Sequence, residues 1–132
     1  MYSNGASETI IGKALKKYEI PRENVVILSK CYFGVDNTGG QPLISAAGTN
    51  DGEWVNRVGL SRKHILDAVE KSVARLGTYI DVLQIHRLDR DTDREEIMRA
   101  LNDVVQSGKV RYIGASSVSR IFFLVVYARC NI

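Results

Sequence analysis

Three side chains that exchange protons readily stand at comparable places in the sequence, each close to the end of an expected strand. Lys30 and His86 each follow directly on an apolar run that is typical of a buried strand, and Tyr2 precedes the first expected helix. In parallel α/β folds, ligands bind at the carboxyl ends of the strands, because the loops there form the crevice. A phenol, an ammonium and an imidazole in these positions would converge on the crevice at the carboxyl ends of the strands.

Each of these three residues also has an ordinary structural explanation. A lysine after a strand is usually a solvated loop residue, and a histidine beside a charged residue such as Arg87 is usually structural. A tyrosine second from the start of a chain is usually frayed. Composition and spacing alone therefore leave the function open.

The elements that would position these residues alternate between helix and strand along the chain. Capping residues and apolar residues at helical spacing predict helices over 7–18, from Ser61 to Gly77, and from Thr92 or Asp93 to about Gln106. Apolar, β-branched runs predict strands over 25–28, 79–85 and 110–115. This alternation indicates βαβ crossovers and a parallel sheet.

The first helix and the first strand carry the sharpest packing expectations. Ser7 is expected to cap the helix. The helix is expected to turn one apolar stripe inward, made of Ile10, Ile11, Ala14 and Leu15. The strand over 25–28, which ends in Ser29 and Lys30, is apolar on both faces, as a buried parallel strand requires.

Two architectures fit this order, a doubly wound sheet and a (β/α)₈ barrel. A complete barrel takes roughly 250 residues, whereas this chain has 132 residues and about three full strands. The chain is therefore expected to be either a small open sheet or a piece of a barrel. Residues 31–60 show no periodicity, and a loop of that length in a compact domain is usually functional or disordered.

Composition and charge exclude several classes of protein. The net charge of +3 comes from interspersed charges, which gives no grounds for a nucleic-acid interface. Cys31 and Cys130 fit no metal or redox spacing, so two free thiols in a reducing cytoplasm are expected and no metal. We also expect no signal peptide and no membrane span, because the longest apolar run, 121–128, is only strand-sized.

Five segments in order resemble the aldo-keto reductase family, most closely its fungal aryl-alcohol-dehydrogenase-like members. They are YSNGASE at 2–8 with IGKAL at 11–15, ILSK at 27–30, RLG at 75–77, DVLQIHR at 81–87 and SGKVRYIGASS at 107–117. The resemblance runs from residue 2 to about 118. It implies a partial (β/α)₈ barrel, made of about strands 3–5 with their helices around a parallel sheet.

The resemblance also implies a reaction and its residues. It implies NADPH as cofactor and an aldehyde or ketone as substrate, with alcohol oxidation as the reverse. Tyr2 would be the general acid, and Lys30 would assist it, because a nearby ammonium favours the phenolate. His86 would orient and polarise the carbonyl. Ser116 and Ser117 match the pair that holds the nicotinamide carboxamide, although Ser117 departs from the family's usual Asn.

The chain departs from the family pattern at both ends, so we expect it to be truncated there. The family places an Asp about five positions before the Tyr, to pair with the lysine, and this chain starts at Met1. The resemblance stops after Ser117, before the loops that grip the cofactor's phosphates. We therefore expect a partial reductase domain over 1–118 and a divergent tail over 119–132.

Three functional hypotheses follow. The first is a cytoplasmic oxidoreductase that acts on a small carbonyl compound, with Tyr32, Phe33 and Trp54 either touching an aromatic substrate or simply packing at the barrel mouth. The second is a catalytically inactive remnant that binds a partner through its open edges. The third, a doubly wound nucleotide-binding domain, is disfavoured because no G-x-G-x-x-G is present. No oligomeric state follows from the sequence.

Overall fold

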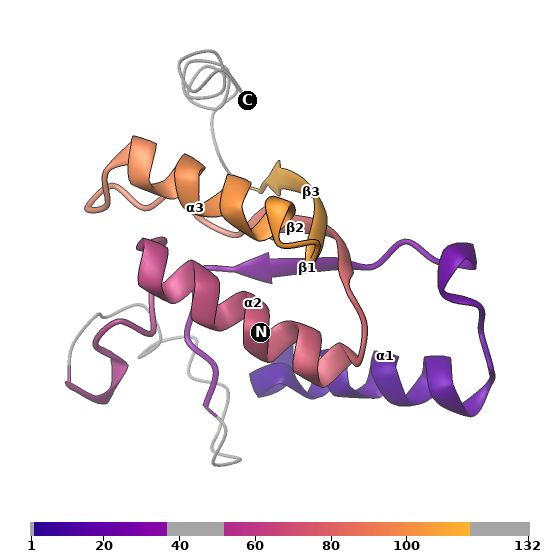
Figure 1. Cartoon of the computed structure of the whole chain (residues 1–132). Helices are drawn as coiled ribbons and strands as arrows, with labels where there is room; N and C mark the ends of the chain where they lie inside the picture. The colour runs from indigo at the N-terminus through magenta and orange to yellow at the C-terminus, as the bar shows by residue number, and fades with distance from the viewer. Residues whose placement is uncertain (1, 37–51, 117–132) are drawn as a thin grey trace.

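In the part of the chain that the structure describes, three parallel strands and three α-helices make up the fold. The computed structural model describes residues 2–36 and 52–116. The strands β1 (Leu28–Cys31), β2 (Ile80–Ile85) and β3 (Val110–Ala115) form one parallel sheet in that order. The helices are α1 (Ala6–Lys17), α2 (Arg62–Leu76) and α3 (Arg94–Gln106), and short 3₁₀ turns lie at Tyr2–Gly5, Arg22–Asn24 and Gly52–Trp54. The predicted alternation of helices and parallel strands is confirmed (Figure 1).

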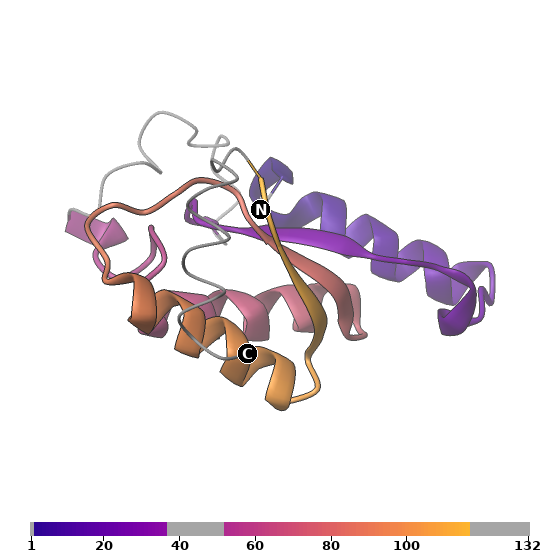
Figure 2. The same ribbon diagram turned by 90° about the horizontal axis from the view of Figure 1, so that it is seen from above.

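The core lies between the sheet and the helices. Helix α2 packs between α1 and α3 and also contacts β1, while α3 packs against β3. Figure 2 shows α2 and α3 running side by side along the same side of the sheet. The largest fully buried side chains are all aliphatic: Leu60, Ile65, Val69, Ile80, Leu83, Leu101, Val104 and Val110. Their removal from water is the main favourable contribution to folding, at roughly 2 kcal/mol for each side chain.

Local capping fixes the bounds of α2 and α3 as the sequence predicted. The Ser61 side chain accepts a hydrogen bond from the His64 N–H and caps α2. Gly77 closes α2 in the left-handed conformation, with φ of 69°. Asp93, rather than Thr92, caps α3 by accepting from the Glu95 and Glu96 N–H groups.

The predictions for α1 are partly wrong. Helix α1 begins at Ala6, and its N-cap is Gly5 with φ of 84°, so Ser7 is not the cap. Ile10 is 64% exposed and Ile11 is also exposed, so the expected inward stripe is not buried, although Leu15 does pack on the core. The helix instead turns Gly12 against α2, where an added Cβ would lie 2.5 Å from the Leu76 carbonyl oxygen.

The first strand begins three residues later than predicted. Pairing starts at Leu28, opposite Val82, and continues to Cys31. The preceding residues are held by other contacts: Val25 N–H donates to the Arg22 carbonyl, and Ile27 N–H donates to the Asp81 carboxylate. The apolar pattern of the sequence gives no sign that the Asp81 side chain bonds the Ile27 N–H in place of a neighbouring strand. The prediction therefore placed the start of the strand too early.

Among the described residues, helices cover only one face of the sheet. Leu28, Val82 and Tyr112 share a register position on the face away from the helices, and Lys30, Gln84 and Gly114 share the next. On this face Leu28 is 54% exposed and Tyr112 is 71% exposed. The expectation that the first strand is buried on both faces is therefore wrong in this chain. In a closed (β/α)₈ barrel the same face lines the interior, so the structure has the form of a partial barrel.

A clamp of polar groups closes the amino end of the sheet. The Arg22 guanidinium donates to the Asp81 carboxylate at 2.5 Å and to the Tyr79 carbonyl at 2.9 Å. It also stacks on the Tyr79 ring, 3.9 Å from the centroid. Burial alone would raise the pKa of Asp81, but the Ile27 N–H and Arg22 outweigh it and hold that pKa below its usual value.

We expect Asp81→Ala to lower the free energy of unfolding by about 2 kcal/mol, because hydrogen bonds to a charged group are each worth about 1.5–3 kcal/mol. Urea unfolding followed by circular dichroism measures this change. Asp67→Ala is the matched control, because Asp67 forms an exposed i,i+4 pair with Lys63 and should change stability by less than about 0.5 kcal/mol. Equal losses in the two variants would contradict the clamp.

Candidate active site

The predicted site residues lie at the carboxyl end of the sheet. Lys30 is in β1 on the open face, in register with Gln84. His86 directly follows β2, and its N–H donates to the Cys31 carbonyl at 2.9 Å, which extends the pairing of β1 and β2 by one step. Tyr2 is 53% exposed in the 3₁₀ turn that precedes α1.

These three side chains meet although they are far apart in the sequence. The Lys30 ammonium nitrogen lies 5.2 Å from the centroid of the Tyr2 ring. The Tyr2 and His86 rings are 6.1 Å apart, centroid to centroid, at an interplanar angle of 51°. The structure thus brings a phenol, an ammonium and an imidazole together at one end of the sheet.

Of the two serines predicted to hold a cofactor, Ser116 lies within the described residues and Ser117 does not. Ser116 directly follows β3, is half-buried, and donates its N–H to the Ile85 carbonyl at 2.9 Å. This bond places Ser116 beside the residue that precedes His86. Ser117 and the predicted tail at 119–132 lie outside the described residues.

The turn that carries Tyr2 has an uncommon backbone conformation. Ser3 and Asn4 both have positive φ, at 49° and 50°, and Gly5 follows at 84°. Left-handed conformations in residues other than glycine cost on the order of 1–3 kcal/mol each and persist only where surrounding contacts hold them. One such contact is the hydrogen bond from the Asp36 N–H to the Asn4 side chain, at 3.4 Å.

The electrostatics of the site favour a neutral histidine. Burial lowers the pKa of His86, and the positive charges of Arg87 and Lys30 lower it further. An uncharged imidazole keeps one N–H to donate and one nitrogen to accept. His86 is therefore suited to hydrogen bonding with a polar ligand atom at neutral pH without adding a third cation beside Lys30 and Arg87.

Among the three aromatic residues considered for a substrate, Phe33 is the one placed against His86. The two rings meet edge to face at 5.2 Å and 89°. Tyr32 packs partly into the core and contacts Phe33 at 5.0 Å. Trp54 lies against Gly34, where a Cβ would be 2.4 Å from its ring, and Arg57 stacks on it. Trp54 thus packs locally, and Phe33 borders the site.

Asp89 is a buried carboxylate that the sequence prediction missed. It accepts hydrogen bonds from the Leu60 N–H at 2.7 Å and from the Thr92 hydroxyl at 2.8 Å, and is 8% exposed. Gly59 lies beside it with φ of 90°, and a Cβ there would lie 2.6 Å from the carboxylate, so both the conformation and the space favour glycine. Asp89 therefore ties the loop after His86 to the segment before α2. The only sign of this role in the sequence is that an Asp stands shortly before the cap of α3. The contact of Asp89 with the Leu60 N–H joins residues that are far apart in the sequence, so the sequence does not show it.

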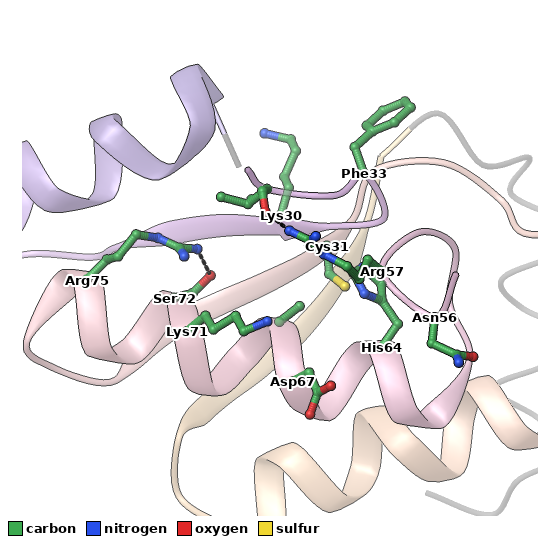
Figure 3. Close-up of a pocket in the computed structure, with 12 residues that line it drawn as sticks. Lys30, Cys31, Phe33, Asn56, Arg57, His64, Asp67, Lys71, Ser72 and Arg75 are labelled. Atoms are coloured by element: carbon green, nitrogen blue, oxygen red, sulfur yellow. Dashed lines mark hydrogen bonds between the residues drawn. The ribbon is translucent and has the colours of Figure 1, made fainter. Parts of the chain in front are cut away.

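A solvent-open pocket lies between α2 and the segment after β1, and Lys30 and Phe33 of the candidate site are among the residues that line it (Figure 3). His64 lines it, and the Nε2 atom of this histidine is buried without a hydrogen-bond partner among the described residues. Burial lowers the pKa of His64 to about 4, despite the nearby Asp67 carboxylate. The Cys31 thiol also lines the pocket, and burial raises its pKa to about 12, so it stays protonated.

Two further features concern metal binding and membrane association. Within residues 2–36 and 52–116, no cluster of three or more His, Cys, Asp or Glu side chains is arranged to hold a metal ion. In the same part of the chain, no helix has the length and apolar character needed to cross a membrane.

The chain matches one protein family and many curated relatives. The model of the aldo/keto reductase family matches residues 1–121. Versiconal hemiacetal acetate reductase of Aspergillus parasiticus is 72% identical over 120 residues, which cover 90% of this chain and 35% of that protein. A relative from Schizosaccharomyces pombe named "Putative aryl-alcohol dehydrogenase" is 58% identical over 126 residues, with 89% and 35% covered. The chain spans about a third of the length of these relatives.

Stability should fall as the pH drops from 6.5 to 4, because the folded state holds His64 neutral while the unfolded chain takes up a proton. With a folded pKa of about 4 against an ordinary 6.5, the loss by pH 4 is about 3 kcal/mol at 1.36 kcal/mol per pKa unit. Urea unfolding at a series of pH values measures it. His64→Gln should flatten the dependence in this window, and an unchanged slope would contradict the assignment to His64.

Proposed function

Because the chain belongs to the aldo/keto reductase family, we propose that it carries the proton-transfer residues for reduction of an aldehyde or ketone with NADPH. The observation that supports this proposal is the convergence of Tyr2, Lys30 and His86 at the carboxyl end of a parallel sheet. That end of a (β/α)₈ barrel is where active sites form. The relatives are longer than this chain. The reaction of the whole protein is therefore itself a proposal.

The three residues would share the work of proton transfer. Tyr2 gives its proton to the carbonyl oxygen, and the product is an alcohol. The Lys30 ammonium, 5.2 Å from the Tyr2 ring, stabilises the phenolate that Tyr2 leaves behind. Neutral His86 donates a hydrogen bond to the same oxygen, which orients the substrate and stabilises developing negative charge. In the reverse direction, Tyr2 takes the proton from the alcohol.

The described residues fit the nicotinamide end of the cofactor. When bound, NADPH supplies the hydride that reduces the carbonyl carbon. Ser116 is a half-buried hydroxyl residue after β3, at the same end of the sheet as His86, and suits hydrogen bonding to a carboxamide. We propose that Ser117 shares this role, and we keep the proposed domain boundary near residue 118.

Small aromatic carbonyl compounds are the substrates that we propose. Phe33 offers an apolar ring beside His86, and a flat substrate packs well against such a ring. The name of the S. pombe relative, an aryl-alcohol dehydrogenase, points to the same class of compound. We place the activity in the cytoplasm, where the free buried thiol of Cys31 stays reduced.

Turnover of an aromatic aldehyde such as 4-nitrobenzaldehyde, followed as NADPH oxidation at 340 nm, tests the proposal. Tyr2→Phe should lower kcat by at least about 10²-fold, since a positioned acid contributes 10²–10⁴-fold. Tyr18→Phe is the matched control, because Tyr18 is an exposed tyrosine just beyond the far end of α1, and it should retain full activity.

If the chain shows no turnover, NADPH binding, followed as quenching of protein fluorescence, separates two explanations. Saturable binding without turnover would place the fault in the chemistry assigned to Tyr2, Lys30 and His86. Absence of both binding and turnover in a folded sample would favour the alternative, a non-catalytic remnant of the family.

A further inference from the structure

One buried carboxylate lies between the two elements that carry Tyr2 and Lys30. Glu8 is in the first turn of α1 and is 5% exposed. One of its oxygens accepts a hydrogen bond from the Ser29 hydroxyl at 2.5 Å, and the other accepts from the Arg75 guanidinium at 2.7 Å. Glu8 therefore joins α1 to β1 and to α2 through a single side chain.

The charge of Glu8 is compensated where it lies. Burial alone would raise the pKa of Glu8, but the positive charge of the amino terminus, the Ser29 hydrogen bond and Arg75 outweigh it, so the pKa is lowered. The carboxylate is thus ionised at neutral pH. Because a buried charge without partners is costly, the three side chains are held to one arrangement.

The Ser29 end of this network controls Lys30. Successive side chains on a strand point to opposite faces of the sheet. Ser29 points to the helices, where Glu8 holds it, and so Lys30 projects from the open face towards Tyr2. A displacement of Ser29 along or across the sheet would move Lys30 by a similar amount.

The Arg75 end of the network controls the turn that carries Tyr2. The turn ends at Gly5, and a Cβ there would lie 2.6 Å from both the Cδ and the Nε of Arg75. The turn therefore rests directly on the Arg75 side chain, which Glu8 orients. Figure 3 shows the second restraint on Arg75, its hydrogen bond to Ser72 on the same helix, at 3.1 Å.

We propose that Glu8 is a positioning residue that sets the spacing between Tyr2 and Lys30. Its carboxylate joins the strand position next to Lys30 to the arginine on which the Tyr2 turn rests. This role rests on the proposed function only for its catalytic meaning, since the spacing exists without cofactor or substrate. The network thereby links the interior of the helix layer to the site on the opposite face of the sheet.

Two serine variants provide a matched test. Ser29→Ala and Ser72→Ala each remove one buried hydroxyl from the same network. Only Ser29 is on the strand that carries Lys30, and in Ser72→Ala the Glu8 carboxylate still holds the Arg75 guanidinium in place. The measurement is the NMR cross-relaxation peak between the Tyr2 ring protons and the Lys30 ε-methylene, recorded on the cofactor-free chain. We expect this peak to be lost in Ser29→Ala and in Glu8→Gln, and to be retained in Ser72→Ala.

The kinetic arm uses the same variants with NADPH and an aromatic aldehyde. Ser29→Ala and Glu8→Gln should lower kcat by about 10–10²-fold, since a misplacement of about 1 Å has costs of this size, while the Kd for NADPH stays unchanged. Retention of the peak in Ser29→Ala, or its equal loss in Ser72→Ala, would overturn the positioning role. Ser29→Ala decides the matter if Glu8→Gln does not fold.

The NMR arm also separates the two proposals. If the peaks follow the expected pattern but the chain has no turnover, the positioning role stands and the proposed function fails. If turnover is present but unaffected by Ser29→Ala, the function stands and the role of Glu8 fails.

Discussion

The parallel pairing of the three strands is the constraint on which the rest of the structure depends. Lys30, Gln84 and Gly114 stand side by side in one register. Two further backbone bonds, from His86 N–H to Cys31 and from Ser116 N–H to Ile85, carry the pairing past the ends of the strands. Because all three strands point the same way, their last residues gather at one edge. Tyr2 then needs only a short turn beside β1 to join them.

Three carboxylates, of which Glu8 and Asp89 are buried and Asp81 is half-buried, fix the elements around this sheet at three levels. Asp81 holds the amino end through Arg22 and the Ile27 N–H. Glu8 joins the helix layer to β1, and Asp89 holds together the loops at the carboxyl end. Each accepts hydrogen bonds from residues far away in the sequence, and the pKa of each is held below its usual value although burial opposes this. Packing of aliphatic side chains holds the sheet and the helices together, and these carboxylates determine how the two layers are aligned.

The sequence allowed prediction of the local capping of α2 and α3, but it missed the cap of α1 and the contacts between distant residues. Ser61 begins α2 and Gly77 ends it through contacts within a few residues, so their roles were readable from the sequence, whereas the sequence left Thr92 and Asp93 open as the cap of α3. The start of β1 was misplaced because Asp81, more than fifty positions away, takes the Ile27 N–H. The family resemblance located Tyr2, Lys30 and His86, whose roles stay proposals, but it gave no indication of Glu8 or Asp89. Their partners become evident only in three dimensions.

The network around Glu8 has a consequence for how such sequences diverge. Gly5 is held by its backbone conformation and by the closeness of Arg75, while Arg75, Glu8 and Ser29 each complete the hydrogen bonding of another. Residues in such contact show non-additive effects when they are substituted. A change at one of the four positions therefore alters which substitutions are tolerated at the other three. Substitutions at these four positions are therefore expected to be coupled, although the positions lie in four elements, the Tyr2–Gly5 turn, α1, β1 and α2.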